Sequence, residues 1–557
     1  MSFAAPKQFN MANPHHLLPP DKNPKKQDIV AAQKIIADIS SGVYRSPAAA
    51  LKELVSNAYD ADAEKVTITT DAPNCRTLVI EDNGIGMTIE KFLDVVTHIG
   101  GSRKRIDGET SEIFKRKLIG RIGIGMLAVA QLGNRFYVSS KVKGSKKRFT
   151  AEVNLEPFHR EDAALKNMAK IDPDGKVQIG AVRYVDDLPE AEELQYTVIT
   201  VPDAKKGLIS EMTSAVRKAV GAEETLSIEN SKIKNFAQLV ELVRSAQRAD
   251  LVLDGYYYML WELALLAPLN YLPGGPFEES QRKIEGIAKF SPPKVESFQV
   301  FVDGMELFRP QLFPNTKAFN YSSPDPKIYL LDYDRMIAGR RLRFSGYIYC
   351  QQPRIHPEEF KGVHIRIRKV GIGRYDKSWL GYPFDEGIKF GQVTGEIYVE
   401  DGLEPALNID RDSFRETDVH YQAMRAYVWE LLRKQVFPEF KSRSKKFRED
   451  NQNTEASKHQ SLFEEKLSKL SAPLTGKILF KRVSQPTIST WIEIDGANLI
   501  IDKLRWETFS QGGNLSGDAE KRFFRVLQVL ISSEILSETN SEEADVLLEA
   551  LAVAVQD

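Results

Sequence analysis

The sequence has few cysteines, no excess of charge of either sign and no long apolar run. Cys75 and Cys350 are its two cysteines among 557 residues, so a disulfide framework is excluded, and they lack metal-ligand spacing. Lys and Arg number 76 against 77 Asp and Glu, so bulk charge indicates no class of partner. The 8 histidines are scattered apart from His15 and His16, which gives no zinc signature.

Membrane association is also not expected. No apolar segment reaches the roughly 18 residues that a membrane span needs, and the N-terminus lacks the apolar core of a signal peptide. Hydrophobic residues make up 42% and charged residues 27% of the chain, which is an ordinary globular balance. We therefore expect a cytoplasmic protein of about three or four domains, without membrane contact.

What the sequence does contain is concentrated between residues 46 and 132, in three motifs. In the first, Ser46 is a good N-cap and Pro47 suits a first turn, which predicts a helix to Ala61. Glu53, Asn57 and Asp60 share one face of this helix. An acid there can take a proton from water and an amide oxygen can ligate Mg²⁺. The alternative interpretation is a solvated helix with an exposed acid.

The second motif follows a pair of predicted strands, Val66–Thr70 and Thr77–Glu81. The second strand leads directly into Asp82-Asn-Gly84-Ile-Gly86-Met87. A carboxylate at a strand end, beside glycines that admit close backbone approach, can accept a hydrogen bond from the amine of adenine. By itself, Asp-Asn-Gly is only a hairpin signal.

The third motif, Gly120–Met126, precedes a helical pattern that begins at Leu127. Glycines before a helix N-terminus present backbone N–H groups to a phosphate. No Gly-Lys-Ser/Thr follows, so this is not a Walker A loop. The basic segment before it is a weak buried strand, which argues against a dinucleotide fingerprint.

In this order, the three motifs resemble the GHKL ATPases with the Bergerat fold, a family that includes gyrase, heat-shock protein 90, histidine kinases and MutL. They are most similar to its heat-shock-protein-90-like and MORC-like prokaryotic branch. The resemblance implies that Glu53 is the general base, that Asn57 is the Mg²⁺ ligand and that Asp82 reads adenine. The other ATP-binding residues that we expect are Asp60, Gly84, Gly86, Met87, Gly100, Ser102, Lys104, Gly120, Gly123, Ile124, Gly125, Met126 and Thr197. Histidine kinases lack a base at the position of Glu53, which argues against that branch.

A fourth motif, Asn408–Phe414, resembles the middle-domain loop of heat-shock protein 90, whose arginine reaches the γ-phosphate from another domain. Arg411 would then be a catalytic arginine finger in cis. The alternative is a local ion pair of Arg411 with Asp410 or Asp412.

The expected fold class is α+β, with a Bergerat ATPase α/β sandwich followed by a transducer-like middle domain. An amphipathic helix is predicted over Asp28–Ser41, and a turn at Gly371–Gly373. The domain boundaries that we expect are a mobile N-terminal arm at 1–25, the ATP-binding domain at 26–204, a helical extension at 205–292, the middle domain at 293–440, a charged helical connector at 441–475 and a small α+β module at 476–557, a candidate for dimerisation.

The predicted function is Mg²⁺-dependent ATP hydrolysis, in which the ATP state closes a lid and changes the conformation of a homodimer acting on a client. The alternative is a nucleotide-gated DNA clamp, similar to MORC and MutL, with slow ATP hydrolysis and a role in antiviral defence or DNA processing. ATP and Mg²⁺ are the expected cofactors. The sequence does not identify the client: MORC-like relatives suggest DNA, chaperone relatives suggest a protein, and no membrane partner is expected.

Overall fold

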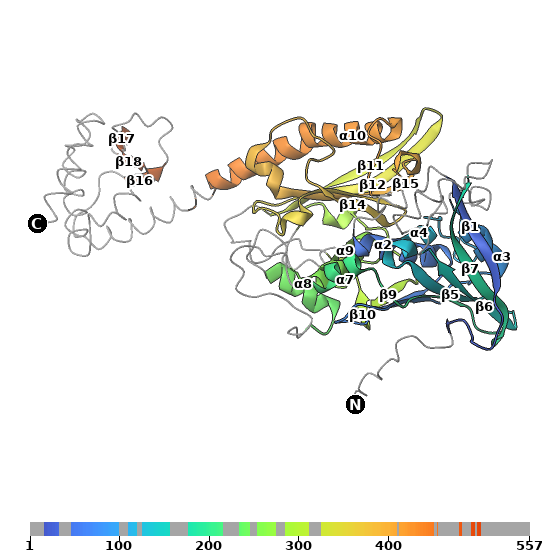
Figure 1. The fold of residues 1–557 in the computed structure, drawn as a ribbon. Coiled ribbons are helices and arrows are strands. Elements are labelled where there is room, and N and C mark those ends of the chain that lie inside the picture. The colour runs from blue at the N-terminus through green and yellow to red at the C-terminus, as the bar shows by residue number, and fades with distance from the viewer. Residues whose placement is uncertain are drawn as a thin grey trace, which may run out of the picture. The chain divides into compact units, whose positions relative to one another are not determined.

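The computed structural model contains a ten-stranded sheet, and two of the predicted site residues, Asp82 and Thr197, lie on its strands (Figure 1). The structure describes residues 16–32, 46–99, 110–119, 125–155, 176–214, 233–245, 253–274, 284–310, 325–408, 412–450, 454, 478–481, 492–495 and 498–502. The chain divides into a first unit of Met1–Asn320 and Asp325–Phe437, and a second of Tyr321–Pro324 and Pro438–Asp557. Each unit is described by itself.

The first sheet combines strands from distant parts of the chain. Most neighbours are antiparallel; β1 with β4 and β2 with β9 are parallel. In spatial order the strands are β10 (Met305–Leu307), β9 (Gln299–Val302), β2 (Lys65–Thr69), β3 (Leu78–Asp82), β8 (Tyr196–Val201), β5 (Arg135–Lys141), β6 (Lys147–Asn154), β7 (Lys176–Pro189), β1 (Lys25–Ala32) and β4 (His98–Ile99).

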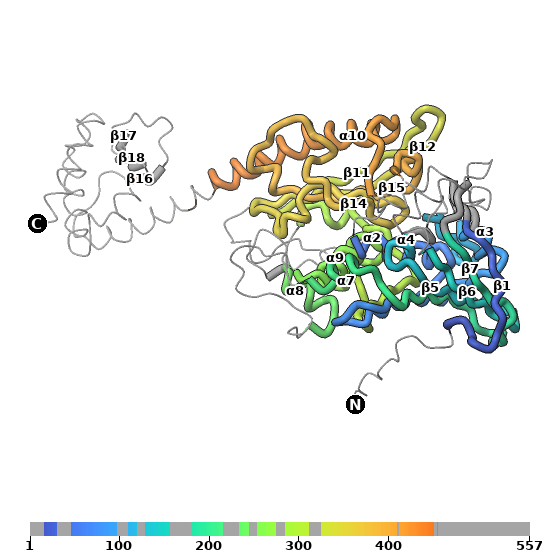
Figure 2. The backbone as a smooth tube through the Cα atoms, viewed as in Figure 1, coloured from blue at the N-terminus to red at the C-terminus, as the bar shows by residue number. Residues whose placement is uncertain are grey.

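Helices that come from separate stretches of the sequence pack together beside this sheet. The central one is α2 (Pro47–Asp60), which contacts α4 (Gly125–Leu132) and α9 (Gly255–Leu266) (Figure 2). Burial of Leu51, Leu54 and Val55 fixes the inward face of α2. The other helices in the described part of this region are α3 (Ile89–Thr97), α7 (Lys206–Thr213), α8 (Phe236–Ser245) and the short η4 (Ile287–Lys289).

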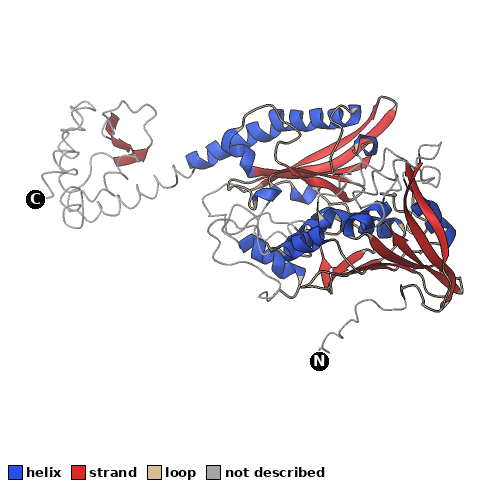
Figure 3. Cartoon of the chain, viewed as in Figure 1, coloured by secondary structure: helices blue, strands red, loops and turns tan. Residues whose placement is uncertain are grey.

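A second sheet of the same unit lies on the other side of these helices (Figure 3). Its order is β11 (Lys327–Ile337), β12 (Arg340–Cys350), β15 (Val393–Asp401), β13 (Gly362–Ile367) and β14 (Val370–Asp376). Helix α10 (Val419–Leu431) packs on this sheet through Tyr427, whose ring contacts those of Tyr333 and Phe344. The short helices here are η5 (Glu358–Phe360), η6 (Gly387–Gln392), η7 (Glu404–Ala406) and the π-helix η8 (Leu432–Val436).

The second unit has a helical stretch over residues 438–450 and a small sheet of β16 (Ile478–Lys481), β18 (Asn498–Asp502) and β17 (Ile492–Asp495). The sequence predicts strands at Lys477–Arg482 and Ser489–Ile494, which are confirmed as β16 and β17, whereas β18 was not predicted. The helices predicted around residues 519–533 and 542–555 lie outside the described residues.

The helix predicted to Ala61 and the strands predicted at Val66–Thr70 and Thr77–Glu81 are confirmed to within a residue or two as α2, β2 and β3. The sequence also predicts strands at Asn134–Val142, Lys146–Val153 and Tyr196–Val201 and a buried helix at Tyr256–Leu266, which are confirmed as β5, β6, β8 and α9. The helix predicted over Asp418–Gln435 is confirmed as α10, which continues into η8.

The helix predicted over Asp28–Ser41 is wrong for its first part. Residues 28–32 belong to β1, because their backbone pairs with β7. The turn predicted at Gly371–Gly373 is also wrong, since both glycines lie inside β14.

The predicted boundary near residue 293 does not separate the two sheets. β9 and β10 follow it in sequence but extend the first sheet beside β2. Asp303, between them, accepts hydrogen bonds from Thr70 N at 2.8 Å and from the Tyr256 hydroxyl at 2.7 Å. None of the helices in the described part of the chain has the length and apolarity that a membrane crossing requires.

Candidate active site

Helix α2 presents the predicted general base in a buried position. The Ser46 side chain accepts a hydrogen bond from Ala49 N at 3.2 Å, which confirms the predicted cap. Glu53 is 1% exposed, so the alternative of a solvated acid is wrong for this residue. Asn57 and Asp60, on the following turns, are half-buried. A buried carboxylate beside a more accessible amide is an arrangement that can accept a proton and ligate a cation.

The neighbour of Glu53 in the sequence, Lys52, joins this helix to the motif of residues 408–414. Lys52 is fully buried, and its Nζ lies 3.4 Å from Glu53 Oε1 and 3.2 Å from Asp412 Oδ1. Asp412 adjoins Arg411, the predicted arginine finger. Asp412, one of the two acids considered as local partners of Arg411, thus contacts a lysine on α2; Arg411 lies outside the described residues, so both interpretations of it stay predictions. Sequence reasoning missed Lys52, since nothing in the motif marks a lysine for burial.

The Asp82–Met87 loop is shaped by close backbone approaches. Ile85 N donates to Ala61 O at 2.8 Å, which holds the loop on the end of α2. Gly86 has φ +69°, and a Cβ there would lie 2.1 Å from Lys141 O. Only glycine fits at this position, as the motif predicted.

Asp82 stands at one end of a row of polar residues across three neighbouring strands. Asp82 pairs with Thr197 on β8, and Thr197 pairs with Ser140 on β5. The Ser140 and Thr197 hydroxyls are 3.0 Å apart, and Ser140 Oγ accepts from Met87 N at 2.9 Å. Ser140 was not predicted, because only the strand register places it here.

The electrostatics of Asp82, which is half-buried, suit a role as a hydrogen-bond acceptor. Burial raises the pKa of Asp82 to about 7, although its 2.9 Å hydrogen bond from Gly84 N opposes the shift. A carboxyl of this kind, held in a polar row at a strand end, can hydrogen-bond an exocyclic amine.

The polar, basic segment Ser102–Ile119 is predicted to be a lid over the nucleotide, and two acids at the end of α2 hold its last part. Asp60 Oδ1 accepts from Ile119 N at 2.7 Å, and Asp62 accepts from Ile113 N at 2.7 Å and Phe114 N at 3.2 Å. We call residues 110–119 the lid base. One oxygen of Asp60 is therefore committed to the backbone, and its role in binding ATP stays a prediction.

The most buried cation of the lid base is held by backbone carbonyl groups. Arg116 is 8% exposed and donates to four backbone carbonyls, those of Tyr59, Ala63, Glu296 and Ser297. Its guanidinium also lies 4.4 Å from the centre of the Tyr59 ring. Arg116 therefore fastens the lid base to α2 and to the segment before β9.

Several expected site residues lie outside the described residues, namely Gly100, Ser102, Lys104, Gly120, Gly123, Ile124 and Arg411. Gly125 and Met126 open α4, so a helix begins directly after the glycine motif. A helix N-terminus after glycines, a buried acid and a polar row ending in Asp82 together fit the chemistry of a nucleoside triphosphate with Mg²⁺.

Comparison with known proteins agrees with this geometry. Residues 44–178 match the family described as "Histidine kinase-, DNA gyrase B-, and HSP90-like ATPase". This match confirms the resemblance to the GHKL ATPases for the part of the chain that carries the three motifs, and it supports ATP binding and hydrolysis by this class of domain.

The chain is also similar to curated proteins of three kinds. It is 40% identical over 100 residues to the putative type II restriction enzyme HgiDII of Herpetosiphon aurantiacus, which covers 17% of this chain and 15% of that protein. It is 31% identical over 136 residues to the chaperone protein HtpG of Rhizobium meliloti, or 20% of this chain and 22% of the relative. It is 30% identical over 123 residues to the DNA mismatch repair protein MutL of Rickettsia canadensis, or 22% and 19%. The chain thus matches less than a quarter of the length of these relatives.

Proposed function

We propose that this protein is an ATPase in which Glu53 activates water and the loop around Arg411 engages the same site. The observation that carries the proposal is the Lys52 bridge, because one buried ammonium contacts both Glu53 and Asp412. This contact brings the loop that precedes α10 to the helix that bears the general base. Both residues belong to the first unit of the chain.

Each predicted site residue has a role in this proposal. Asp82 accepts a hydrogen bond from the adenine amine, and the Thr197 and Ser140 hydroxyls extend the polar row beside it. Glu53 takes a proton from the attacking water. The Asn57 side-chain oxygen would hold Mg²⁺, which when bound neutralises phosphate charge and positions the triphosphate. Arg411 stabilises the charge that develops in the transition state.

The test is ATP turnover by the purified full chain. Glu53→Ala should lower turnover by roughly 10²–10⁴-fold while nucleotide binding persists, since a general base contributes about this factor. Asp82→Asn should weaken nucleotide binding itself. Glu193→Ala changes an exposed acid on the turn before β8 and serves as the matched control. Normal turnover by Glu53→Ala would remove Glu53 from its role.

We further propose that ATP binding favours a homodimer, as in the first function considered from the sequence. Sedimentation with and without a non-hydrolysable ATP analogue tests this directly. An unchanged sedimentation coefficient at saturating analogue would contradict a nucleotide-driven change of assembly.

The second candidate function is a nucleotide-gated DNA clamp. The similarity to MutL and to a putative restriction enzyme favours it, while the similarity to HtpG favours a protein client. DNA retention that requires the ATP analogue and falls steeply with salt would establish the clamp. Equal retention with and without nucleotide would leave the protein-client function as the better proposal.

A further inference from the structure

The hairpin of β13 and β14 turns through two residues that are unusual for this geometry. Ile367 pairs with Val370, so Arg368 and Lys369 form a two-residue connection. Their φ angles are +48° and +75°. Turns with positive φ at both central residues normally use asparagine or glycine. The backbone is therefore strained at Arg368 and Lys369, and proteins retain such strain chiefly at functional sites.

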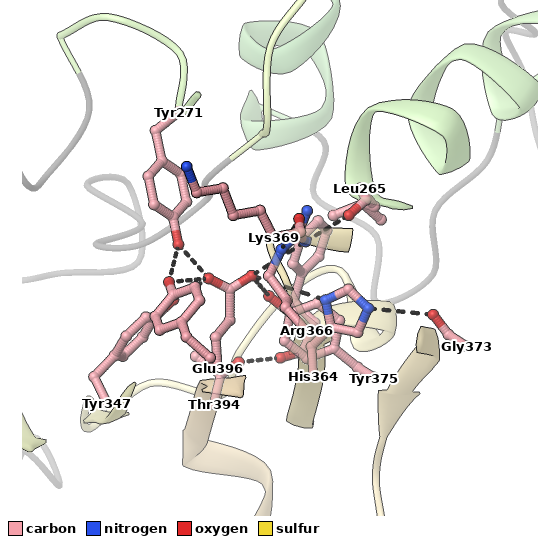
Figure 4. A network of polar contacts seen from close by, with 12 residues as sticks. Leu265, Tyr271, Tyr347, His364, Arg366, Lys369, Gly373, Tyr375, Thr394 and Glu396 are labelled. Carbon is pink, nitrogen blue, oxygen red and sulfur yellow. Dashed lines mark hydrogen bonds and ion pairs between the residues drawn. The ribbon is translucent and has the colours of Figure 1, made fainter. Parts of the chain in front are cut away.

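A buried polar network fixes the turn through the backbone carbonyl of Lys369 (Figure 4). Arg366 is fully buried and donates to Lys369 O at 3.2 Å, and also to Leu265 O at 2.6 Å and Ala267 O at 2.8 Å, at the end of α9. Glu396, at the centre of the network, lies 3.9 Å from Arg366. The strained turn is thus held in one position rather than left to relax.

Arg368 connects the turn to the lid base. Its guanidinium donates to Leu118 O, and its Nε lies 2.8 Å from Glu404 Oε1. Its charge is therefore paired. The role of Arg368 is to join the second sheet to the segment that ends the lid.

Lys369 differs from Arg368. It is half-buried, and none of the described residues gives its ammonium a hydrogen bond or an ion pair. Burial lowers the pKa of Lys369, the nearby charge of Arg116 lowers it further, and Glu296 opposes them. Among the described residues, no carboxylate lies within ion-pair distance of this ammonium.

A cavity of about 600 Å³ opens between the turn and the lid base. Five cationic side chains line it against two carboxylates, Glu296 and Glu400. The cations are Lys115, Arg116, Lys117, Arg368 and Lys369. The hydrogen bonds of the Arg116 guanidinium go to neutral carbonyl groups, so its charge is not neutralised by them and adds to the positive potential in the cavity. The rings of Tyr59 and Tyr398 supply part of an apolar wall.

We propose that this cavity binds the phosphate group of a small ligand, with Lys369 as its principal contact. The volume lies within the range of small-molecule sites, roughly 300–1,000 Å³. A bound phosphate would give Lys369 its missing partner and would join the turn to the lid base. The site is separate from the one assigned to Glu53 and Asp82, and it does not depend on ATP hydrolysis.

Calorimetric titration of the full chain with sodium pyrophosphate tests this site. The protein is first saturated with a non-hydrolysable ATP analogue, so that pyrophosphate cannot report on the proposed ATP site. Wild type should bind one pyrophosphate per chain, and the affinity should fall as salt is added. Lys369→Ala should weaken binding roughly tenfold or more, as expected for a lost charge-assisted hydrogen bond. Lys143→Ala removes an exposed lysine of the β5–β6 turn and should change nothing.

Lys369→Gly separates binding from folding. Glycine relieves the strain at φ +75°, so this variant should melt at a higher temperature and yet lose pyrophosphate affinity. Wild-type affinity in Lys369→Gly, or no binding by wild type, would overturn the proposal. ADP in place of pyrophosphate distinguishes the ligand sources, since tighter binding of ADP indicates a nucleotide and equal binding indicates a phosphate alone. If the ATP analogue does not bind while Lys369-dependent pyrophosphate binding persists, the proposed ATPase fails and this site stands.

Discussion

Replacing Lys52 by methionine should destabilise the first unit strongly. The Lys52 ammonium is fully buried and lies 3.4 Å from a Glu53 oxygen and 3.2 Å from an Asp412 oxygen. These side chains are themselves only 2% and 7% exposed. At an effective dielectric constant of about 20, the gross attraction in each contact is about 5 kcal/mol, and desolvation of the three charges offsets much of it. Lys52→Met leaves two buried carboxylates without this cation, so we expect a loss of about 3–5 kcal/mol.

Urea unfolding, read as a double-mutant cycle with Asp412→Asn, measures the contact itself. We expect a coupling free energy of about 1–3 kcal/mol, because the two residues share one buried charge network. Lys434→Met is the matched control. Lys434 lies closer to its partner Glu430, at 2.7 Å, but the two side chains are 74% and 62% exposed. That variant should therefore change stability by less than about 0.5 kcal/mol. A coupling below about 0.5 kcal/mol between Lys52 and Asp412 would refute the bridge.

Three further outcomes follow from the described contacts. The pKa of Asp82 is about 7 in the folded protein against an ordinary 3.8, so between these pH values the folded protein binds more protons than the unfolded chain. The stability of the nucleotide-free protein should therefore fall as pH rises through this window. Asp82→Asn should make the melting temperature less dependent on pH. Arg116→Ala should cost about 3 kcal/mol or more in urea unfolding, since buried carbonyls lose their donor, and a cost below 1 kcal/mol would contradict the packing role. Gly86→Ala should abolish nucleotide binding, because its Cβ would lie 2.1 Å from Lys141 O. Gly304→Ala, also at positive φ but with open space around it, should retain binding. Equal nucleotide binding by the two variants would show that the close approach at Gly86 is unimportant.

The sequence was sufficient wherever the signals lie within a few residues of one another. The α2 helix was predictable because its cap, its apolar stripe and its acidic face all fall between residues 46 and 61. The loop after Asp82 was predictable for the same reason, since its glycines adjoin the strand that ends there.

Contacts between distant residues could not be predicted in this way. Lys52 and Asp412 are 360 residues apart, and no local pattern distinguishes a buried lysine from a solvated one. Ser140 joins the polar row only through the register of β5 and β8. The β13–β14 turn was misplaced because glycines mark turns, while the actual turn is made of Arg368 and Lys369.

The parallel pairing of β2 with β9 has a consequence for the order in which the chain is made. β8 ends at Val201 and β9 ends at Val302, so about a hundred further residues are synthesised after β8 before β9, the second neighbour of β2, is complete. At about 5–20 residues per second, this interval is roughly 5–20 s on the ribosome. During that time the backbone groups of β2 form an open edge that can pair with other chains. A fragment that stops at residue 204 would keep β2 as an open edge permanently, whereas a fragment that extends past β10, to about residue 310, pairs β2 with β9 and leaves the short strand β10 as the edge.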